Sequence, residues 1–379
     1  MSSFPKGSFV STTTGAVFPL HEPRWCGDDG ELLDLEFDAV FDPRRVESRA
    51  ADIWRYREAL PLPDTAERVS CGEPMTPLVT LEVAGLEVAT KLDYLFPSGS
   101  YKDRGSAVLI SFLKAQGVTS VVQDSSGNAA ASIAQYCARG GISCRIYVPE
   151  RASPAKIRQI VAYGAEVERV SGTREETAGA ALAAAGQTFY ASHVWHPCYF
   201  HGTKTFAYEI CEQLGWRAPD TLILPVSNGA LFLGSYLGLR DLVRAGIIGD
   251  MPRLVAVQTE TCPPIYNAHR DDLATVERCE PRLTIAEGIA ANFPARGSQI
   301  LGYLRNTGGT CLAVSEDEIK STLVELCSQG FYVEPTAAVA IAGVKQYVRE
   351  YARKGETIVS TLTGSGLKAP EQIAAIVNG

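Results

Sequence analysis

The amino-acid sequence predicts an α/β fold with two doubly wound domains, each built on a mostly parallel twisted sheet. The main observation is that continuous apolar runs, such as TLILPV (221–226) and TIVSTLT (357–363), alternate with helical patterns. Strands that are apolar on both faces are typical of parallel sheets covered by helices on each side. The strand–helix runs fall into two sets, and a chain of 379 residues exceeds the size of an ordinary single core.

The first set of elements follows an irregular amino-terminal stretch, which extends from residue 1 to about 75 and contains a polar helix candidate at 43–60. Pro149 ends one strand of this set, and Ser153 is the expected cap of the next helix. In chain order, the pattern predicts a strand at 118–123, a helix at 127–141, a strand at 144–149, a helix at 153–165, a strand at 166–170, a helix at 173–185 and a short strand at 188–191.

The second set lies in the carboxyl-terminal half of the chain. Its helix at 315–330 begins with SEDE, a capping box in which serine and glutamate side chains satisfy backbone amides. The remaining elements are helices at 203–216, 230–246 and 337–355 and strands at 221–226, 253–258 and 357–363.

The two sets predict two domains that share a cleft, because no long linker separates them. The large domain is expected to comprise residues 76–104 and 192–379, and the small α/β domain residues 105–191. Residues 1–75 are expected to form an N-terminal extension that packs on the large domain.

Charge and composition exclude several classes of protein. The formal net charge is −8, whereas nucleic-acid and anionic-membrane binding require positive fields. The sequence has no apolar run of about 18 residues, no apolar signal core and no CxxC pair among its ten cysteines. These features predict a cytoplasmic protein with free thiols and with neither a membrane nor a nucleic-acid partner.

Four loops at strand ends carry residues suited to ligand chemistry, since ligands of open α/β sheets lie beyond the carboxyl ends of strands. In PSGSYKDRGS, Lys102 follows small residues just before a helix, and a partly buried lysine amine can form a Schiff base with an aldehyde. In DSSGNAAAS, Ser125, Ser126 and the first amides of a helix favour a carboxylate, and Asn128 can bond a ring hydroxyl.

The other two loops supply a phosphate cradle and a hydroxyl. In PVSNGALFLG (225–234), small residues free successive backbone amides to hold a phosphate. In TLTGSGLK (361–368), Thr363 offers a neutral hydroxyl. Each loop alone also fits an ordinary turn or cap, but together the four meet the needs of pyridoxal 5′-phosphate holding an amino acid.

The sequence resembles the fold type II, or β-family, pyridoxal-phosphate enzymes, and among them the threonine synthases. The resemblance implies a fold like that of the tryptophan synthase β subunit, with the cofactor in the cleft between the domains, a homodimer and a small amino-acid substrate. The matching stretches occur in family order between about 71 and 368: CGEPMTPLVTL, PSGSYKDRG, SSGNAAAS, HGTKTFAYEI, LPVSNGALFLG, TIAEGIA, VEPTAA and LTGSGLK.

By this resemblance, Lys102 holds the cofactor aldehyde and, once freed, acts as the general base at Cα. Asn128 contacts the 3′-oxygen of the ring, Thr363 faces the pyridine nitrogen and Gly288 lies near the ring. The cofactor phosphate is wrapped by Ser227, Asn228, Gly229, Ala230 and Leu231, and the substrate carboxylate by Ser125, Ser126, Asn128 and Ala129.

The hydroxyl of Thr363 also bears on the reaction type. A neutral hydroxyl cannot keep the pyridine nitrogen protonated as a carboxylate would, so the ring is a weaker electron sink. A long-lived carbanion is then disfavoured, which suits elimination and replacement better than transamination. The implied protein is a carbon–oxygen lyase of amino-acid metabolism that converts O-phosphohomoserine and water into threonine and phosphate.

Two departures from the family pattern change the expectations. Cys26 stands alone where many relatives carry the paired cysteines of a zinc ribbon, so no metal is expected. Relatives that act on O-phosphohomoserine tend to carry asparagine, serine and arginine before GTKT. This sequence lacks the arginine. A substrate phosphate then loses a charged hydrogen bond, worth about 1.5–3 kcal/mol of binding free energy, unless Lys156 or Arg158 supplies one. Here that run holds His193, Val194, His196 and Tyr199.

Three alternatives stay open. The missing arginine favours another fold type II lyase or β-replacement enzyme, such as a serine/threonine dehydratase-like enzyme, a diamino-acid ammonia-lyase or a specialised-metabolism synthase. A pyridoxal-phosphate-binding regulatory protein without turnover is disfavoured, because Lys102, Asn128 and Thr363 are all present. A non-covalent nucleotide-binding protein ranks last, since no GxGxxG or GxxxxGK(S/T) follows a suitable strand.

Overall fold

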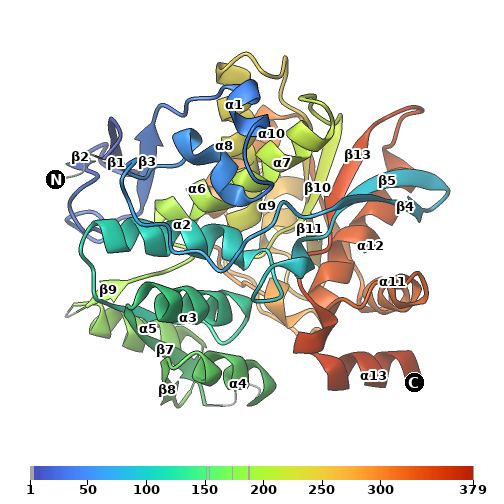
Figure 1. Ribbon diagram of the computed structural model, residues 1–379. Coiled ribbons are helices and arrows are strands. Elements are labelled where there is room, and N and C mark those ends of the chain that lie inside the picture. Colours follow the sequence, from blue (N-terminus) through green and yellow to red (C-terminus); the bar gives the residue numbers. More distant parts are fainter. Residues whose placement is uncertain (1–3, 151, 153, 173, 187, 379) are drawn as a thin grey trace. The chain divides into compact units, whose positions relative to one another are not determined.

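The computed structural model describes residues 4–378 except 151, 153, 173 and 187, so the expected cap Ser153 lies outside the described residues (Figure 1). The chain forms two compact units. Unit 1 contains the residues up to Met75 together with Lys102–Thr205, and unit 2 contains Thr76–Tyr101 together with Phe206–Gly379.

Unit 1 is built on a four-stranded parallel sheet in the order β8-β7-β6-β9. Helices follow the strands as the sequence pattern predicts, and α3 and α5 pack against β7. The strands are β6 (Ser120–Gln123), β7 (Ser143–Pro149), β8 (Glu166–Val170) and β9 (Phe189–Tyr190). The helices are α2 (Lys102–Ala115), α3 (Asn128–Gly140), α4 (Pro154–Ala162), α5 (Arg174–Ala184) and α6 (Pro197–Thr203).

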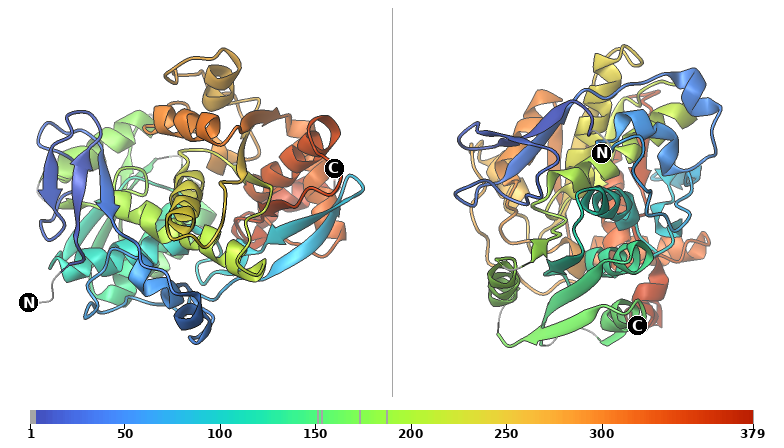
Figure 2. Two further views of the ribbon diagram at one scale, coloured as in Figure 1. Left: turned by 90° about the horizontal axis from the view of Figure 1, so that it is seen from above. Right: turned by 60° about the vertical axis from the view of Figure 1, so that its left-hand side comes forward.

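The amino-terminal stretch, expected to be irregular, instead forms a three-stranded antiparallel sheet (Figure 2, deep blue). Its strands are only three to five residues long and carry polar residues, so their apolar pattern is faint in the sequence. Burial of Phe9, Leu33 and Leu35 supplies the core that fixes them. The strands are β1 (Gly7–Ser11), β2 (Val17–Pro19) and β3 (Leu33–Phe37).

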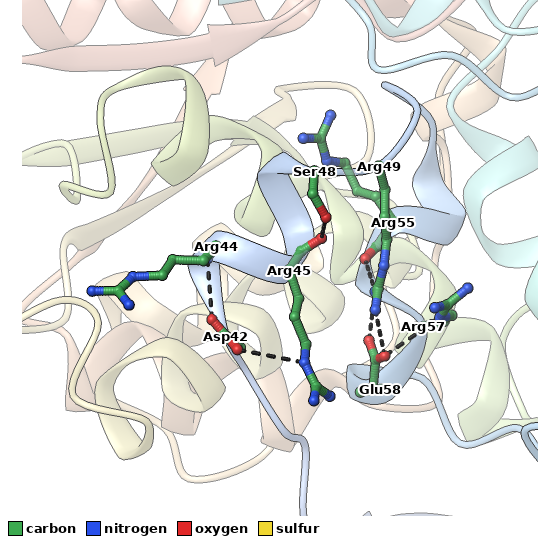
Figure 3. A network of polar contacts seen from close by, with 8 residues as sticks. All are labelled: Asp42, Arg44, Arg45, Ser48, Arg49, Arg55, Arg57 and Glu58. Carbon is green, nitrogen blue, oxygen red and sulfur yellow. Dashed lines mark hydrogen bonds and ion pairs between the residues drawn. The ribbon is translucent and has the colours of Figure 1, made fainter.

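The helix candidate at 43–60 is divided in the structure. It forms the short helix α1 (Pro43–Glu47) and the 3₁₀ helix η1 (Ile53–Ala59), each with an aspartate N-cap. Arg49, between them, makes two 2.6 Å hydrogen bonds to the carboxylate of Glu58 (Figure 3). These bonds lower the pKa of Glu58 to about 2.

A single buried carboxylate ties the amino-terminal stretch to α3. Glu73 accepts hydrogen bonds from Trp54 Nε1 (2.8 Å), Ser70 Oγ (2.7 Å) and Tyr136 Oη (2.6 Å). Contacts of this kind place the stretch in the same unit as α2 and α3, together with residues 192–205. This grouping differs from the one expected from the sequence, which joined both segments to the large domain.

Unit 2 is built on a six-stranded sheet in the order β12-β11-β10-β13-β5-β4. All neighbouring pairs are parallel except the hairpin β4–β5, which turns at Ala84 and Gly85, both with positive φ. The strands are β4 (Leu78–Val83), β5 (Leu86–Lys91), β10 (Thr221–Pro225), β11 (Arg253–Thr259), β12 (Thr310–Val314) and β13 (Ile358–Thr361).

Helix α12 packs on five strands of this sheet, β4, β10, β11, β12 and β13 (Figure 1). Helix α8 contacts β10, and α10 contacts β11 and β12. A Cβ at Gly343 of α12 would lie 2.3 Å from Val257 Cγ2, so glycine permits close helix–sheet packing. The predicted capping box of Ser315 and Glu318 is confirmed. The helices are α7 (Thr205–Gln213), α8 (Ala230–Arg244), α9 (Pro264–Arg270), α10 (Gly297–Asn306), α11 (Glu316–Ser328), α12 (Pro335–Glu350) and α13 (Pro370–Asn378), with 3₁₀ helices η2 (Asp93–Leu95), η3 (Glu287–Ile289) and η4 (Gly366–Lys368).

The predicted fold class is confirmed: two α/β units carry mostly parallel sheets. Within the described part of the chain, no helix combines the length and apolar character needed to cross a bilayer.

Candidate functional site

Lys102 is the first residue of α2 and is half-buried. Its backbone carbonyl accepts a 3.0 Å hydrogen bond from the hydroxyl of Tyr199. The Tyr199 ring lies against Gly105, where a Cβ would come within 2.3 Å of the ring carbon Cε1. Glycine at 105 therefore allows the tyrosine to fix the first turn of α2 from the side.

A second contact fixes the start of α2 relative to α3. Ser132 Oγ on α3 donates to Asp103 Oδ1 at 2.6 Å and lies 2.7 Å from Ser106 Oγ on α2. All three side chains are fully buried, so each of these bonds is shielded from water. Lys102, the neighbour of Asp103, is thereby held in a set relation to the amino end of α3.

The loop between β6 and α3 carries the predicted carboxylate-binding residues. Its backbone is held by two hydrogen bonds, Ser125 N to Gln123 Oε1 (2.8 Å) and Gly127 N to Ser125 Oγ (3.2 Å). Gly127 is the N-cap of α3 and has no side-chain oxygen to offer the first-turn amides. The helix N-terminus is therefore suited to an anionic acceptor from a ligand. The candidates Ser125, Ser126 and Asn128 are half-buried and Ala129 is buried.

In unit 2, the loop between β10 and α8 carries the predicted phosphate-binding residues. Gly229 caps the 15-residue helix α8 with φ 82° and ψ 11°, a left-handed conformation that favours glycine. A Cβ there would lie 2.3 Å from Ile300 Cδ1. The small N-cap and the helix dipole together form a cradle that fits a phosphate. Ser227 and Asn228 are half-buried, and Gly229, Ala230 and Leu231 are buried.

Thr363, also in unit 2, lies just beyond β13 and is 2% exposed. Its carbonyl oxygen accepts from Tyr101 N at 3.0 Å, and Ser100 forms a β-bridge with Gly364. The Ser100 hydroxyl is fully buried and has no hydrogen-bond partner in the part of the chain that the structure describes. A buried hydroxyl of this kind can be satisfied by a polar ligand or by a water molecule.

The structure brings the candidates together within each unit. Unit 1 holds Lys102 and the carboxylate loop, and unit 2 holds the phosphate loop and Thr363. Gly288, expected near the ring, lies in η3, where a Cβ would be 2.9 Å from Thr336 Oγ1. An amine, a carboxylate cradle, a phosphate cradle and a neutral hydroxyl are the donor set that pyridoxal phosphate with a bound amino acid requires, so the residues fit this cofactor.

The sequence alone did not reveal the role of Gln123, which orders the Ser125 loop. The sequence signal for Gln123 is a polar side chain at the end of a buried apolar strand.

Cys198 is fully buried, and burial raises the pKa of its thiol. A raised thiol pKa is typical of a structural cysteine. Among the described residues, no group of three or more histidine, cysteine or acidic side chains is placed to hold a metal ion.

Comparison with protein families decides the cofactor. The model of the family described as pyridoxal-phosphate-dependent enzyme matches residues 69–364. The chain belongs to this pyridoxal-phosphate-dependent enzyme family. It is a pyridoxal-phosphate-dependent lyase of fold type II, as predicted.

Curated relatives that this chain resembles include threonine synthases of several organisms. That of Methanocaldococcus jannaschii is 31% identical over 371 residues, which is 94% of this chain and 92% of the relative. That of a Bacillus species is 32% identical over 84% of this chain and 90% of the relative. A solved structure, the processed threonine deaminase isoform 2 of Solanum lycopersicum, matches with a TM-score of 0.68 and 21% identity over 92% of this chain and 97% of that chain, which supports the fold alone.

Proposed function

We propose that this lyase catalyses the threonine synthase reaction, in which O-phosphohomoserine and water give threonine and phosphate. The observation that carries the proposal is the fixed relation of Lys102 to the carboxylate loop through the Ser132–Asp103 bond of 2.6 Å. A base and a carboxylate cradle on one rigid pair of helices can hold Cα of an amino acid beside the amine. Similarity to threonine synthases along nearly the whole chain supports this choice.

We assign the roles as follows. Lys102 binds the cofactor aldehyde and moves the proton at Cα. Asn128 contacts the ring 3′-oxygen, and Thr363 faces the ring nitrogen. The substrate carboxylate is bound by Ser125, Ser126, Asn128 and Ala129, and the cofactor phosphate by Ser227, Asn228, Gly229, Ala230 and Leu231.

The bound cofactor supplies electron withdrawal from Cα of the amino acid. Thr363 contributes a neutral hydroxyl, which does not keep a proton on the ring nitrogen as a carboxylate would. Moderate withdrawal favours loss of a leaving group over transamination. We further propose that the protein acts as a cytoplasmic homodimer.

The proposal is tested by phosphate release from O-phosphohomoserine, with threonine identified as the product. Lys102→Ala is the control and should lower the rate by about 10³-fold, since general base catalysis contributes on the order of 10²–10⁴. Borohydride reduction of the holoprotein, followed by peptide mapping, should place the cofactor label on Lys102. Phosphate release no faster than that of the control would rule out this reaction, and a label on another lysine would rule out the assignment of Lys102.

One observation favours a second candidate, elimination or replacement on an amino acid without a phosphate. The run before GTKT holds His193, Val194, His196 and Tyr199 and no arginine. Of the suggested substitutes, Arg158 is exposed on α4, and the side chain of Lys156 lies outside the described part of the structure. A panel of serine, threonine, homoserine esters and diamino acids, with product analysis, separates the two candidates.

A further inference from the structure

The unit 2 sheet carries a buried glutamine at the end of β11, beside the loop that follows β10. Strands β10 and β11 are parallel neighbours, with Pro225 opposite Val257. Val226, the residue after β10, continues this pairing, since its N–H donates to the Val257 carbonyl at 2.9 Å. Gln258 follows Val257 on β11 and is fully buried. The start of the loop that carries Ser227 therefore runs beside Gln258.

The side-chain amide of Gln258 makes hydrogen bonds in two directions. Its oxygen accepts from Ile265 N at 2.9 Å and from Tyr266 N at 3.0 Å, both in the first turn of α9. Its nitrogen donates to the Val226 carbonyl at 3.2 Å. Backbone N–H groups must meet the oxygen of the amide, so α9 determines that the nitrogen faces Val226. Gln258 thus uses both ends of its amide, and a side chain without a donor cannot replace it.

The bond to Val226 also sets the direction of the next backbone amide. Val226 is fully buried, and a buried carbonyl needs a donor. The Ser227 N–H belongs to the same peptide group as this carbonyl, and the peptide bond is trans. A trans peptide group is planar, with its C=O and N–H pointing in opposite directions. Because Gln258 fixes the carbonyl on one side, the Ser227 N–H is turned to the other.

The other end of the loop is held by a separate contact. Gly229 has φ 82°, and a Cβ there would lie 2.3 Å from Ile300 Cδ1. The loop is therefore anchored by Gln258 at its start and by the packing of Gly229 on Ile300 at its end. A preorganised set of amides binds an anion better than a mobile set, because less conformational freedom is lost on binding.

We propose that Gln258 is a positioning residue for the cofactor phosphate, because its bond to the Val226 carbonyl directs the Ser227 N–H toward that phosphate. The inference rests on the proposed function, which assigns the phosphate to the loop from Ser227 to Leu231. Gln258 acts through the backbone rather than by contact with the cofactor. A ligand that lacks the phosphate gains nothing from this arrangement, so the effect is specific for the phosphorylated cofactor.

The test compares pyridoxal 5′-phosphate with pyridoxal, which lacks the phosphate. The cofactor is removed from the holoprotein with hydroxylamine, each compound is titrated back, and Kd is read from the absorbance of the bound compound. The ratio of the two Kd values measures what the phosphate contributes to binding. Gln258→Glu keeps the acceptor for α9 and loses the donor. It should lower the ratio about tenfold, the equivalent of one hydrogen bond, and leave the Kd of pyridoxal unchanged.

Two further variants separate positioning from charge and from folding. Gln258→Met is neutral, has a similar length and also lacks the donor, so it should lower the ratio by a similar factor. Gln116 in unit 1 offers a matched control, because its Nε2 donates to the carbonyls of Leu20 and Glu22 at 2.7 and 3.0 Å. Gln116→Met loses bonds of the same kind and should keep the native ratio. In ³¹P NMR of the holoproteins, the cofactor signal should shift in both Gln258 variants and stay in place in Gln116→Met.

The inference fails unless both Gln258 variants lower the ratio. A lower ratio in Gln258→Glu alone would be the effect of an added charge. Equal weakening of both compounds, or a similar loss in Gln116→Met, would be a general effect on the fold and would also contradict the inference.

Gly229→Ala distinguishes this inference from the assignment on which it rests. If Gly229→Ala lowers the ratio and the Gln258 variants do not, the inference alone fails. If none of these variants lowers the ratio, the assignment of the phosphate to this loop fails with it. Phosphate release from O-phosphohomoserine by the native protein is a separate result that neither outcome changes.

Discussion

The two loops proposed to bind ligands share one plan and differ in what holds them. Each follows a parallel strand and ends in a glycine N-cap, Gly127 before α3 in unit 1 and Gly229 before α8 in unit 2. Gly127 has φ −115° and open space where a Cβ would lie. Gly229 has φ 82°, and Ile300 occupies the space of a Cβ. Glycine is thus required by backbone conformation only in the unit 2 loop.

The difference teaches that the glycine cap of the proposed phosphate cradle is set by the backbone, whereas the proposed carboxylate loop is set by a side chain. Gln123 supplies the acceptor for the Ser125 amide, so the unit 1 loop depends on one replaceable residue. A loop of this kind can change specificity without a change in fold. The phosphate of the cofactor is constant, so its cradle gains from rigidity.

One ion pair chosen from each unit shows a difference in burial. In unit 2, Lys91 and Glu209 lie 2.7 Å apart, and both side chains are 0% exposed. In unit 1, the side chains of Arg49 and Glu58 are 17% and 29% exposed. The sharpest tests of the contrast therefore change one group in each unit.

The largest effect is expected from Lys91→Met. Lys91 Nζ also donates to Gln213 Oε1 at 2.7 Å and to the carbonyl of Thr76. Its removal takes away the ion-pair partner that lies 2.7 Å from the buried Glu209 carboxylate, which should cost roughly 3–5 kcal/mol in the free energy of unfolding. Urea denaturation measures this loss. The double variant Lys91→Met, Glu209→Met should regain much of it, and a double variant no more stable than the single one would contradict the argument.

Gly229→Ala should come next. A side chain at φ 82° is strained by roughly 1–3 kcal/mol, and the added methyl meets Ile300. We expect lower thermal stability and weaker retention of pyridoxal phosphate, measured by dialysis and absorbance. Adding Ile300→Val should recover only the steric part of the loss. Full retention of the cofactor by Gly229→Ala would show that this loop does not hold the phosphate.

Arg49→Ala should cost about 1 kcal/mol at neutral pH, because the pair is partly exposed to water. The folded pKa of Glu58 is lowered from 4.5 to about 2, so the pair stabilises the fold above pH 4.5 and loses this effect as the pH falls toward 2. Unfolding free energies of native protein and variant, measured across this range, should converge at the acid end. A constant gap would exclude Glu58 as its origin.

The smallest effect is expected from Gly127→Ala. The φ is negative and the Cβ position is open, so the reduced entropy of the unfolded chain offsets the poorer N-cap. The free energy of unfolding should change by about 0.5 kcal/mol or less. A loss as large as that of Gly229→Ala would remove the distinction between the two loops.

How far the sequence predicts the structure depends on the length of the apolar pattern. The strand at 166–170 was predicted with the bounds that β8 has, and the Ser315 capping box was found by its motif. The short sheet β1–β3 and the split of 43–60 were missed, because neither has a run of apolar residues long enough to show a period. Those elements form only against a core that other segments supply.

The residues of the candidate site also differ in how far the sequence predicts them. Motifs at Lys102, Asn128, Gly229 and Thr363 identify the cofactor, because small residues and a lysine at strand ends leave a local trace in the sequence. The contact between Gln123 and His193 leaves no such trace, since the two residues lie 70 positions apart in the chain. By itself the sequence determined the fold class and the cofactor. Only the tertiary structure decided that His193 lies 3.1 Å from Gln123, because the parallel pairing of β6 and β9 makes the segments after these strands neighbours.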